Sequence, residues 1–453
     1  MKNEKPNLPT ELMASIAQSA RQLLMKYGLC DSCLGRQFAL LGRNMTNSER
    51  GKSLKLYLTL TGSKLKEKEE DIEAIEFLKT LADHGAFQPA IATLKQFGID
   101  VDSPTPCYIC GGFMDKFDEF KELIQKRLAK LEFNTFLIGT RVPAGIIERE
   151  DNFRAEFNIE FGESIKAELN REIGKRLQTT EKEVSFESPD VVAVINPVSQ
   201  EIELQVNPLF VYGRYKKLKR GISQTRWVCW NCEGEGCEEC NGTGLRYEHS
   251  VEVFIAEPVL KAAGGTEYKF HGAGREDIDA RMLGTGRPFV VEIKEPKKRL
   301  LDLKKLQNQI NEFAEGNIEV MDLGWSDRVT IRNIKALAQV KEKTYRMLVE
   351  TQDEITLEAA KQADEALTGA IIQQKTPQRV LHRRADKLRI KKVYEFKTTL
   401  KEPRKLEIVV RCQGGCYVKE LVSGDEGRTQ PNLSELLNTK LSVLELDVLD
   451  VAS

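Results

Sequence analysis

Acidic and basic side chains alternate between glycines in one short segment of the chain. The segment HGAGREDIDARMLGTGRPF spans residues 271–289 and places the carboxylates of Asp277 and Asp279 between Arg275 and Arg281. Glycines allow a backbone that presents a side chain at close range, and flanking arginines favour an ionised carboxylate. Such a carboxylate can act as a nucleophile, a base or a metal ligand. The segment is therefore a candidate catalytic loop, and the alternative is a surface loop of salt bridges.

A phenol and an ammonium group lie two residues apart further along the chain. Tyr417 and Lys419 follow a strand predicted over residues 406–411. If the extended backbone continues, side chains two residues apart point to the same face, and both groups enter one pocket. The alternative is a half-buried edge strand whose lysine reaches solvent.

Eight of the ten cysteines form four Cys-x-x-Cys pairs, which favours metal binding over a disulfide framework. One set has only four residues between its two pairs, a spacing that can close a tetrahedral zinc site. The other set can do so only if the fold brings its distant halves together. Neither set leaves a ligand position open, so we expect structural Zn²⁺ at one or both sites; reduced thiols without metal are the alternative. The ligands would be Cys229, Cys232, Cys237 and Cys240, and Cys30, Cys33, Cys107 and Cys110.

The net charge of the chain excludes a uniformly basic coat for binding nucleic acid. Its 68 Lys and Arg residues balance 69 Asp and Glu residues. Two segments are nevertheless basic: residues 211–227 hold six Lys or Arg and no acid, and residues 376–392 hold seven Lys or Arg and one acid. Because aromatic residues and a histidine lie among these cations, we expect contacts with unpaired RNA. The alternative is two solvated faces.

Several functions lack a supporting motif. No apolar run approaches the roughly 18 residues of a membrane span, and the start of the chain has no signal-peptide pattern, so we expect a cytoplasmic protein without a membrane partner. No phosphate-binding or dinucleotide-binding glycine loop occurs, so we expect no nucleotide cofactor. The hydrophobic pattern predicts helices over residues 10–27 and 164–178, a hairpin from 191–195 and 202–206, and strands over 135–139, 154–160, 251–255, 289–293, 406–411 and 443–448.

Several long segments, in this order along the chain, resemble the archaeal Pus10 family of tRNA pseudouridine synthases. They are CDSCLGRQF, CYICGG, FVYGRYKKLKRGISQTRW, GREDIDARMLGTGRPF, TPQRVLHRRADKLRIKK and GGCYVKELVSGDEGRTQPNLSELL. The resemblance covers essentially the whole chain. It implies an α+β multidomain protein, with a zinc-stabilised half that contains a THUMP domain and a mixed α/β catalytic domain. The boundaries expected are 1–112 for a helical segment with the long-range zinc site, 113–228 for the THUMP-type module and basic segment, 229–247 for a zinc knuckle, and 248–453 for the catalytic domain.

The resemblance also implies roles for single residues. Asp277 matches the catalytic aspartate because it follows Arg275 and Glu276 as the family's Arg-x pair requires; Asp279 is the alternative. Three residues would contact the substrate beside Arg275: Tyr345 would stack on the uracil, Tyr417 would take the C5 proton, and Leu436 would pack beside the pocket. Lys419 would keep the aspartate charged. No cofactor is implied for catalysis.

The substrate that the resemblance implies is the TψC arm of tRNA, with uridines 55 and 54 as the targets. The THUMP half would hold the acceptor end. Two other functions compete: a THUMP-bearing tRNA thiolase or methyltransferase, and a zinc-dependent RNA-binding protein without catalysis. The first would need an SGGxDS loop or a nucleotide-binding glycine loop, and the sequence has neither. An activity assay distinguishes the second function, RNA binding without catalysis, from that of a pseudouridine synthase.

Overall fold

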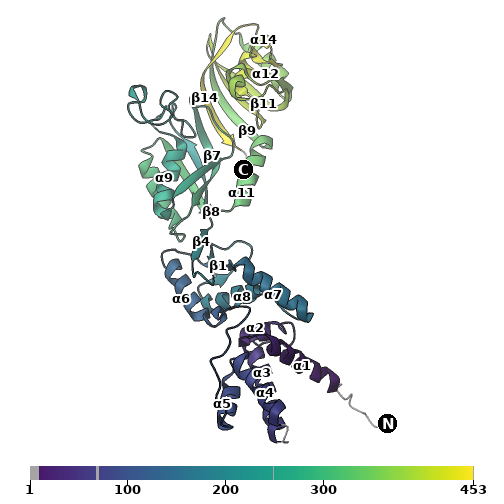
Figure 1. Cartoon of the computed structure of the whole chain (residues 1–453). Helices are drawn as coiled ribbons and strands as arrows, with labels where there is room; N and C mark the ends of the chain where they lie inside the picture. The colour runs from purple at the N-terminus through teal and green to yellow at the C-terminus, as the bar shows by residue number, and fades with distance from the viewer. Residues whose placement is uncertain (1–9, 68–70, 248, 452–453) are drawn as a thin grey trace, which may run out of the picture. The chain divides into compact units, whose positions relative to one another are not determined.

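The computed structural model describes residues 10–67, 71–247 and 249–451. The chain divides into two compact units, Met1–Val206 and Asn207–Ser453. Figure 1 shows the chain with its helices and strands labelled. We expected the basic segment up to residue 228 to belong with the THUMP-type module, but the structure pairs its strand with the sheet of the second unit.

The first unit begins with five helices and continues with a small α/β part. The helices are α1 (Thr10–Lys26), α2 (Asp31–Arg36), α3 (Asn47–Glu67), α4 (Asp71–Asp83) and α5 (Gln88–Gln96), and α1 confirms the helix expected there. Buried Arg36 of α2 ties the two parts of this unit together. Its guanidinium donates to Glu150 at 2.8 Å and to Glu168 at 2.9 Å, both in the α/β part.

The α/β part of the first unit is a four-stranded sheet with three helices. The strands lie in the order β2 (Glu183–Val184), β1 (Thr135–Thr140), β3 (Val191–Ile195) and β4 (Ile202–Val206), and the helices are α6 (Phe117–Leu128), α7 (Ala144–Phe157) and α8 (Ile165–Leu177). β1 runs parallel to β3, and β3 and β4 form the expected antiparallel hairpin. The helix expected over residues 164–178 is confirmed as α8, which Ser164 caps through its side chain.

The strand expected over residues 154–160 is wrong, because α7 extends to Phe157. Ile146, Glu150 and Phe153 are the buried residues of this helix, and their spacing of four and three is helical. Asn158 then ends the helix in the left-handed conformation at φ 50°.

The second unit is built on one ten-stranded mixed sheet. Its order is β13, β10, β11, β12, β9, β14, β7, β5 and β8, and β6 pairs with β7 beside this path. Among the described strand pairs of this sheet, only the central β14–β7 pair is parallel. The bounds are β5 (Leu209–Lys217), β6 (Glu267–Gly272), β7 (Ala280–Lys294), β8 (Ile318–Trp325), β9 (Glu342–Thr351), β10 (Ile371–Gln374), β11 (Arg389–Glu402), β12 (Lys405–Gln413), β13 (Thr429–Gln430) and β14 (Leu441–Val451). The strands expected over 289–293, 406–411 and 443–448 are confirmed within β7, β12 and β14.

Helices cover the two halves of this sheet separately. Figure 1 shows α9 against the half that holds β7, and α12 and α14 against the half that holds β11. The helices of the unit are α9 (Val251–Ala263), α10 (Leu303–Phe313), α11 (Arg328–Val340), α12 (Leu357–Leu367), α13 (Val418–Ser423) and α14 (Leu433–Leu436). The described part of the chain contains no helix long and apolar enough to cross a membrane.

The strand expected over residues 251–255 is also wrong, because this segment is the start of α9. Its apolar run fits the two-residue period of a strand as well as the 3.6-residue period of a helix. The buried residues Val251, Phe254, Ile255 and Val259 follow the helical period. The Ser250 side chain caps the first turn, and Gly264 ends the helix at φ 61°.

One buried carboxylate joins the three central strands of the sheet. Asp447 on β14 lies directly opposite Arg281 on β7 and Arg346 on β9. Its side chain is 3% exposed and accepts hydrogen bonds of 2.7–2.8 Å from both arginines and from Arg220. Burial opposes ionisation, but hydrogen bonds from Arg281 and Arg346 outweigh it and lower the pKa of Asp447 to about 2.

We expect Asp447→Asn to destabilise the second unit by about 1–2 kcal/mol at pH 7, since its partly exposed arginines recover some hydration. A carboxyl whose pKa is lowered by folding stabilises the folded state at pH values above its unfolded pKa of about 3.9. This stabilisation is lost as the pH falls towards the pKa of the folded state. The difference in unfolding free energy between wild type and variant should therefore be constant from pH 7 to pH 5 and shrink by pH 3. Urea denaturation at the three pH values measures it, and an unchanged difference at pH 3 would contradict this account.

Candidate active site

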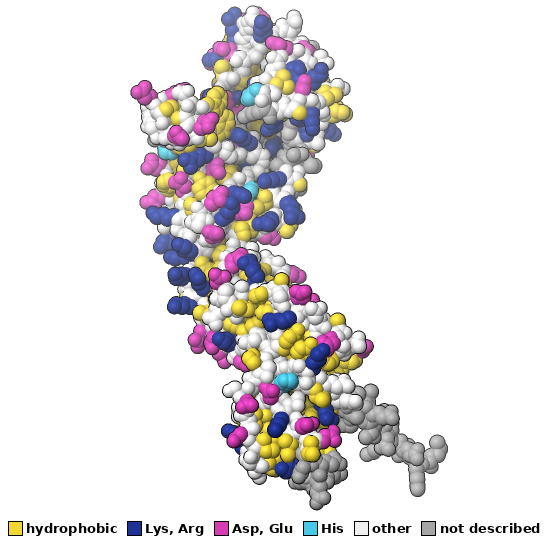
Figure 2. Space-filling model, viewed as in Figure 1, with side chains coloured by type: hydrophobic (Ala, Val, Ile, Leu, Met, Phe, Trp, Pro, Cys, Tyr) yellow, Lys and Arg dark blue, Asp and Glu magenta, His cyan; other side chains and the backbone are white. Residues whose placement is uncertain are grey.

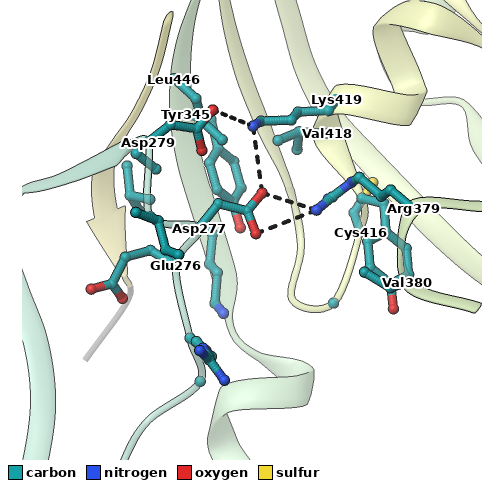
Figure 3. Close-up of a pocket in the computed structure, with 18 of the residues that line it drawn as sticks. Glu276, Asp277, Asp279, Tyr345, Arg379, Val380, Cys416, Val418, Lys419 and Leu446 are labelled. Carbon is teal, nitrogen blue, oxygen red and sulfur yellow. Dashed lines mark hydrogen bonds and ion pairs between the residues drawn. The ribbon is translucent and has the colours of Figure 1, made fainter. Parts of the chain in front are cut away.

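The second unit contains an open cavity of about 1040 Å³. Its walls come from the loop between β6 and β7, from β9 and β14, from the 3-10 turn Gln378–Arg383, and from the start of α13. Figure 3 shows the residues that meet in it. The structure therefore brings together three sequence segments that were candidates separately.

Asp277 lies in this cavity between two cations. Its carboxylate is 3.2 Å from Nη1 of Arg379 and 3.6 Å from Nζ of Lys419, and the close-up shows both groups pointing at it (Figure 3). The side chain of Asp277 is one-third exposed, so it can meet a ligand without leaving its partners. Arg379 is held in turn by Glu420, which accepts from its Nε at 2.6 Å. The arrangement presents a paired but accessible carboxylate to the cavity.

Asp279 is the more exposed of the two candidate carboxylates. It also pairs with Lys419, at 2.7 Å, but its side chain is 64% exposed and no contact with Arg379 is within ion-pair distance among the described residues. Partial burial opposes ionisation of Asp279, and Lys419 outweighs it and lowers the pKa of this carboxyl. Lys419 thus bridges both carboxylates, while Asp277 alone also contacts Arg379.

Most of the other expected site residues also line the cavity. Tyr345 enters from β9, and Figure 3 shows its ring beside Asp277. Burial raises the pKa of the Tyr345 hydroxyl. Tyr417 accepts a 3.0 Å hydrogen bond from Arg384 and lies under the guanidinium of Arg389. Arg275 lines the mouth of the cavity and is exposed.

Leu436 is the expected site residue that the structure does not bring to the cavity. It lies on α14, with 42% of its surface exposed, and does not line the cavity. The apolar wall comes instead from Leu446 and Val448 of β14, and Leu446 is labelled beside Asp279 in Figure 3. The mismatch arises because residues 433–436 form a separate helical turn, capped by Asn432, beyond α13.

The expected extended backbone at Tyr417 and Lys419 is wrong. β12 ends at Gln413, and α13 begins at Val418 with Tyr417 as its first flanking residue. The side-chain amide of Gln374 fixes this junction by accepting from the Tyr417 N–H at 2.9 Å and donating to its carbonyl at 2.9 Å. Both side chains reach the cavity because a helix starts there.

A buried polar network holds the loop that carries Asp277. Glu276, beside it in sequence, is buried and pairs with Arg287 at 2.8 Å, and the Tyr215 hydroxyl donates to it at 2.9 Å. Lys217 is fully buried beneath the loop and donates to the carbonyls of Asp277 and Ile278 at 3.0 Å each. Burial lowers the pKa of Lys217 to about 8, so its ammonium stays charged at pH 7. The network fixes the backbone from which Asp277 projects.

This network changes the interpretation of the first basic segment. RNA contact was expected along residues 211–227, but Arg214 and Lys217 are buried and bond to backbone carbonyls. Lys216 pairs with Glu319, and Arg220 pairs with Glu445 and Asp447. The expectation is therefore wrong for the buried Arg214 and Lys217, whereas Lys216 and Arg220 are partly exposed and held in ion pairs.

Lys217→Met should lower the rate of the reaction expected from the sequence by about 10- to 100-fold with little change in KM, because a shift of about 1 Å in a catalytic group can cost 100-fold. The measurement is the single-turnover rate on saturating RNA. Lys219→Met removes an exposed lysine of the same segment and is the matched control. Equal rates for the two variants would show that the buried ammonium does not position the loop.

The second basic segment does face the cavity. Arg379, Arg384, Lys387, Arg389 and Lys391 all line it, and together with Lys343 they make its walls strongly cationic. Figure 2 shows Lys and Arg side chains, in dark blue, around the hollow of this unit. Arg379 was not predicted from the sequence as a partner of Asp277. A run of basic residues shows that cations are frequent there, but it does not show which of them pairs with a carboxylate.

The two cysteine sets each form a compact cluster. Within each set, the four Sγ atoms lie within 4.8 Å of one another, so the distant halves of the first set do meet. The Cys30–Cys110 and Cys232–Cys240 Sγ distances are 3.7 and 3.8 Å. A tetrahedral site with Zn–S bonds of about 2.3 Å requires sulfur separations of about 3.8 Å. Both clusters can hold a metal ion; the first lies in the first unit and the second in the second unit.

Comparison with known families places matches in both units. Residues 210–452 match the family model described as "Pus10, C-terminal", and residues 120–196 match "Pus10 THUMP domain, archaeal". The chain is 47% identical over 441 residues to "tRNA pseudouridine synthase Pus10" of Methanocaldococcus jannaschii, covering 95% of this chain and 93% of that one. It is 40% identical to the protein of the same name from Methanothrix thermoacetophila, covering 98% and 96%.

Two solved structures resemble the chain more distantly. One is a Cbf5-Nop10-Gar1 complex, with a TM-score of 0.27, 16% identity and 43% of each chain covered. The other is a pseudouridylate synthase, with a TM-score of 0.20, 13% identity, and coverage of 56% of this chain and 70% of that chain.

Proposed function

The chain belongs to the Pus10 family of tRNA pseudouridine synthases, and we propose from this premise that it isomerises uridines 55 and 54 in the TψC arm of tRNA, with Asp277 as the nucleophile. The observation that carries the proposal is the accessible Asp277 carboxylate between Lys419 and Arg379 in a cationic cavity. As a family member the chain is an isomerase.

The reaction replaces the bond between the sugar and N1 of uracil by a bond between the sugar and C5, with one proton lost and one gained. The N1–C1′ glycosidic bond of uridine breaks, the base turns, and a C5–C1′ bond forms; C5 loses a proton and N1 gains one. The nucleophile can attack the sugar or the base, or start a glycal route, and each route begins with an ionised carboxylate at the flipped nucleotide. Lys419 and Arg379 are the two cations that face the Asp277 carboxylate.

The other residues of the cavity divide the remaining tasks. Tyr345 stacks on the uracil beside Asp277, which holds the base while it turns. Tyr417 takes the C5 proton on its phenol oxygen, which also accepts from Arg384, while its own hydroxyl proton passes to solvent, so the phenol is neutral before and after the transfer. Arg275 at the mouth and the cations of residues 379–391 bind phosphates of the flipped strand.

The first unit supplies a second contact with the same RNA. Its archaeal Pus10 THUMP match supports binding of the tRNA acceptor end, which would set the distance to the TψC arm. We place this work in the cytoplasm, where the tRNA substrate is found.

Tritium release tests the target positions. A tRNA transcript labelled with tritium at C5 of uridine releases tritium to water when C5 bonds to C1′. We expect release from the wild-type transcript without any cofactor, a reduced yield when uridine 55 or uridine 54 alone is replaced by cytidine, and none when both are replaced. Undiminished release from the doubly replaced transcript would place the target elsewhere.

We infer that both cysteine clusters hold structural zinc. Backbone N–H groups point at the sulfurs in each cluster, from Gly112 to Cys110 at 3.3 Å and from Gly236 to Cys232 at 3.2 Å. Such donors stabilise thiolates, which are the ligand form of cysteine. Bound zinc would cross-link the chain segments that carry the cysteines, and neither cluster lines the catalytic cavity.

Metal analysis of the purified chain should give two zinc ions per chain. Cys232→Ser should lower the count to one, because one lost thiolate opens a tetrahedral site. Cys412→Ser is the control, since Cys412 is a buried cysteine outside both clusters and should leave the count at two. A count of zero in wild type purified without chelator would rule out zinc at either site.

A further inference from the structure

Three aromatic rings and two guanidinium groups form a continuous row on the surface of the second unit. We call Trp227, Trp230, Arg246, Tyr247 and Arg275 the stacking row. The Arg246 guanidinium lies 4.1 Å from the centre of the Trp230 ring and within 5.8 Å of the Trp227 and Tyr247 rings. Arg275 lies 5.1 Å over Trp227, whose ring meets Tyr247 at 5.7 Å.

The stacking row runs from the catalytic cavity to the second cysteine cluster. Trp227 and Arg275 line the mouth of the cavity, and Trp230 lies between the first two cysteines of the cluster. The hairpin at the base of the cluster fixes the row, with the Arg246 N–H donating to the Trp227 carbonyl at 2.9 Å and a bridge between Val228 and Leu245. The backbone of the hairpin thus holds the row together, and the row reaches the cavity at Trp227 and Arg275.

Trp230 has no evident role in the fold. Its side chain is 77% exposed, the most exposed of the three tryptophans of the chain, and it belongs to no buried core cluster of the described residues. The described contact of its ring is with Arg246, whose side chain is also exposed. A large ring held open beside an arginine plane is the arrangement on which unpaired bases stack.

We propose that the stacking row binds unpaired nucleotides of the RNA substrate next to the target uridine. Bases stack on Trp230 and Trp227, and the edges of Arg246 and Arg275 donate to phosphate. A flipped uridine in the cavity leaves its neighbours unstacked at the mouth, where this row begins. The proposal rests on the proposed function, because it takes the strand at the cavity to be RNA.

The charges around the second cysteine cluster determine which side of it the RNA contacts. Glu233, Glu235, Glu238 and Glu239 are exposed in the loops between the cysteines of the cluster, and the small lobe at the upper left of Figure 2 shows acidic side chains. A polyanion is repelled there and attracted to the arginines at the base. The RNA contact is therefore confined to the base, on the cavity side.

Fluorescence of a chain with one tryptophan tests contact directly. Trp227→Phe with Trp325→Phe leaves Trp230 as the single tryptophan, and the Phe at 227 retains a ring. Titration with unmodified tRNA transcript should quench this fluorescence with the same Kd that filter binding gives. Binding without any change in the emission of Trp230 would overturn the proposal.

Kinetics of Trp230→Ala separate this inference from the proposed function. Loss of one stacked base should raise KM and Kd by about fivefold to a hundredfold while kcat at saturating tRNA stays at the wild-type value. Trp325→Ala removes another exposed tryptophan, on β8, and should change neither. An unchanged KM, or a loss confined to kcat, would overturn the inference, whereas a wild-type chain without activity would instead overturn the proposed function.

Discussion

Asp277→Asn is expected to abolish pseudouridine formation and to leave tRNA affinity nearly unchanged. The amide keeps the shape of the side chain but cannot act as a nucleophile, and removal of a catalytic carboxylate typically costs roughly 10⁴-fold or more in rate. We expect affinity to persist because the cations that line the cavity, and not the anionic Asp277, attract phosphate. Single-turnover rates with excess enzyme, together with filter binding of the same transcript, measure both quantities.

Asp279→Asn is the matched control for this prediction. Asp279 also contacts Lys419 but is twice as exposed and lies away from Arg379, so its variant should keep most of the activity. Full activity in Asp277→Asn with none in Asp279→Asn would move the nucleophile to Asp279. Equal losses in both variants would show that the pair acts as one unit around Lys419.

Lys419→Met should lower the rate by about 100- to 1,000-fold, the usual cost of removing one electrostatic contact from a catalytic centre. Lys419 bridges both carboxylates, so its loss leaves Asp277 with Arg379 as its only described cation within 4 Å and leaves Asp279 without an ion-pair partner among the described residues. The single-turnover rate is again the measurement, because it excludes effects on product release.

Lys419→Arg provides the control, since it keeps the charge on a longer side chain. We expect it to restore part of the rate, and the same degree of loss in both variants would indicate a geometric role for the ammonium. Arg379→Gln then reports how much the second cation contributes. A wild-type rate in Lys419→Met would remove Lys419 from the catalytic machinery.

The residues of the site could be proposed from sequence because the chain resembles the Pus10 family, whose catalytic aspartate, stacking tyrosine, second tyrosine and lysine match Asp277, Tyr345, Tyr417 and Lys419. Asp277, Tyr345, Tyr417 and Lys419 come from three separated segments, and the structure places all four in one cavity. Their roles stay predictions until the variants are measured. The second cysteine cluster was predictable from the four-residue gap between its pairs, whereas the first depended on the fold to bring Cys30 and Cys33 to Cys107 and Cys110.

Burial and partner choice could not be predicted in the same way. Lys217 and Lys219 look alike in a basic run, yet one is fully buried under the catalytic loop and the other is exposed. Arg379 and Asp277 form an ion pair although they are far apart in the sequence, and no motif spacing predicts such a contact. The apolar start of α9 fitted a strand as well as a helix, and only its burial against the sheet decides between them.

The central claim is that this chain makes pseudouridine in the TψC arm without any cofactor. Its most direct test is to incubate an unmodified tRNA transcript with the purified chain alone, to treat the RNA with carbodiimide, and to map the adducts by primer extension. We predict stops that report uridines 55 and 54 and that are absent with Asp277→Asn. A tight complex whose TψC arm carries no pseudouridine would contradict the claim and would identify the chain as an RNA-binding protein without catalysis.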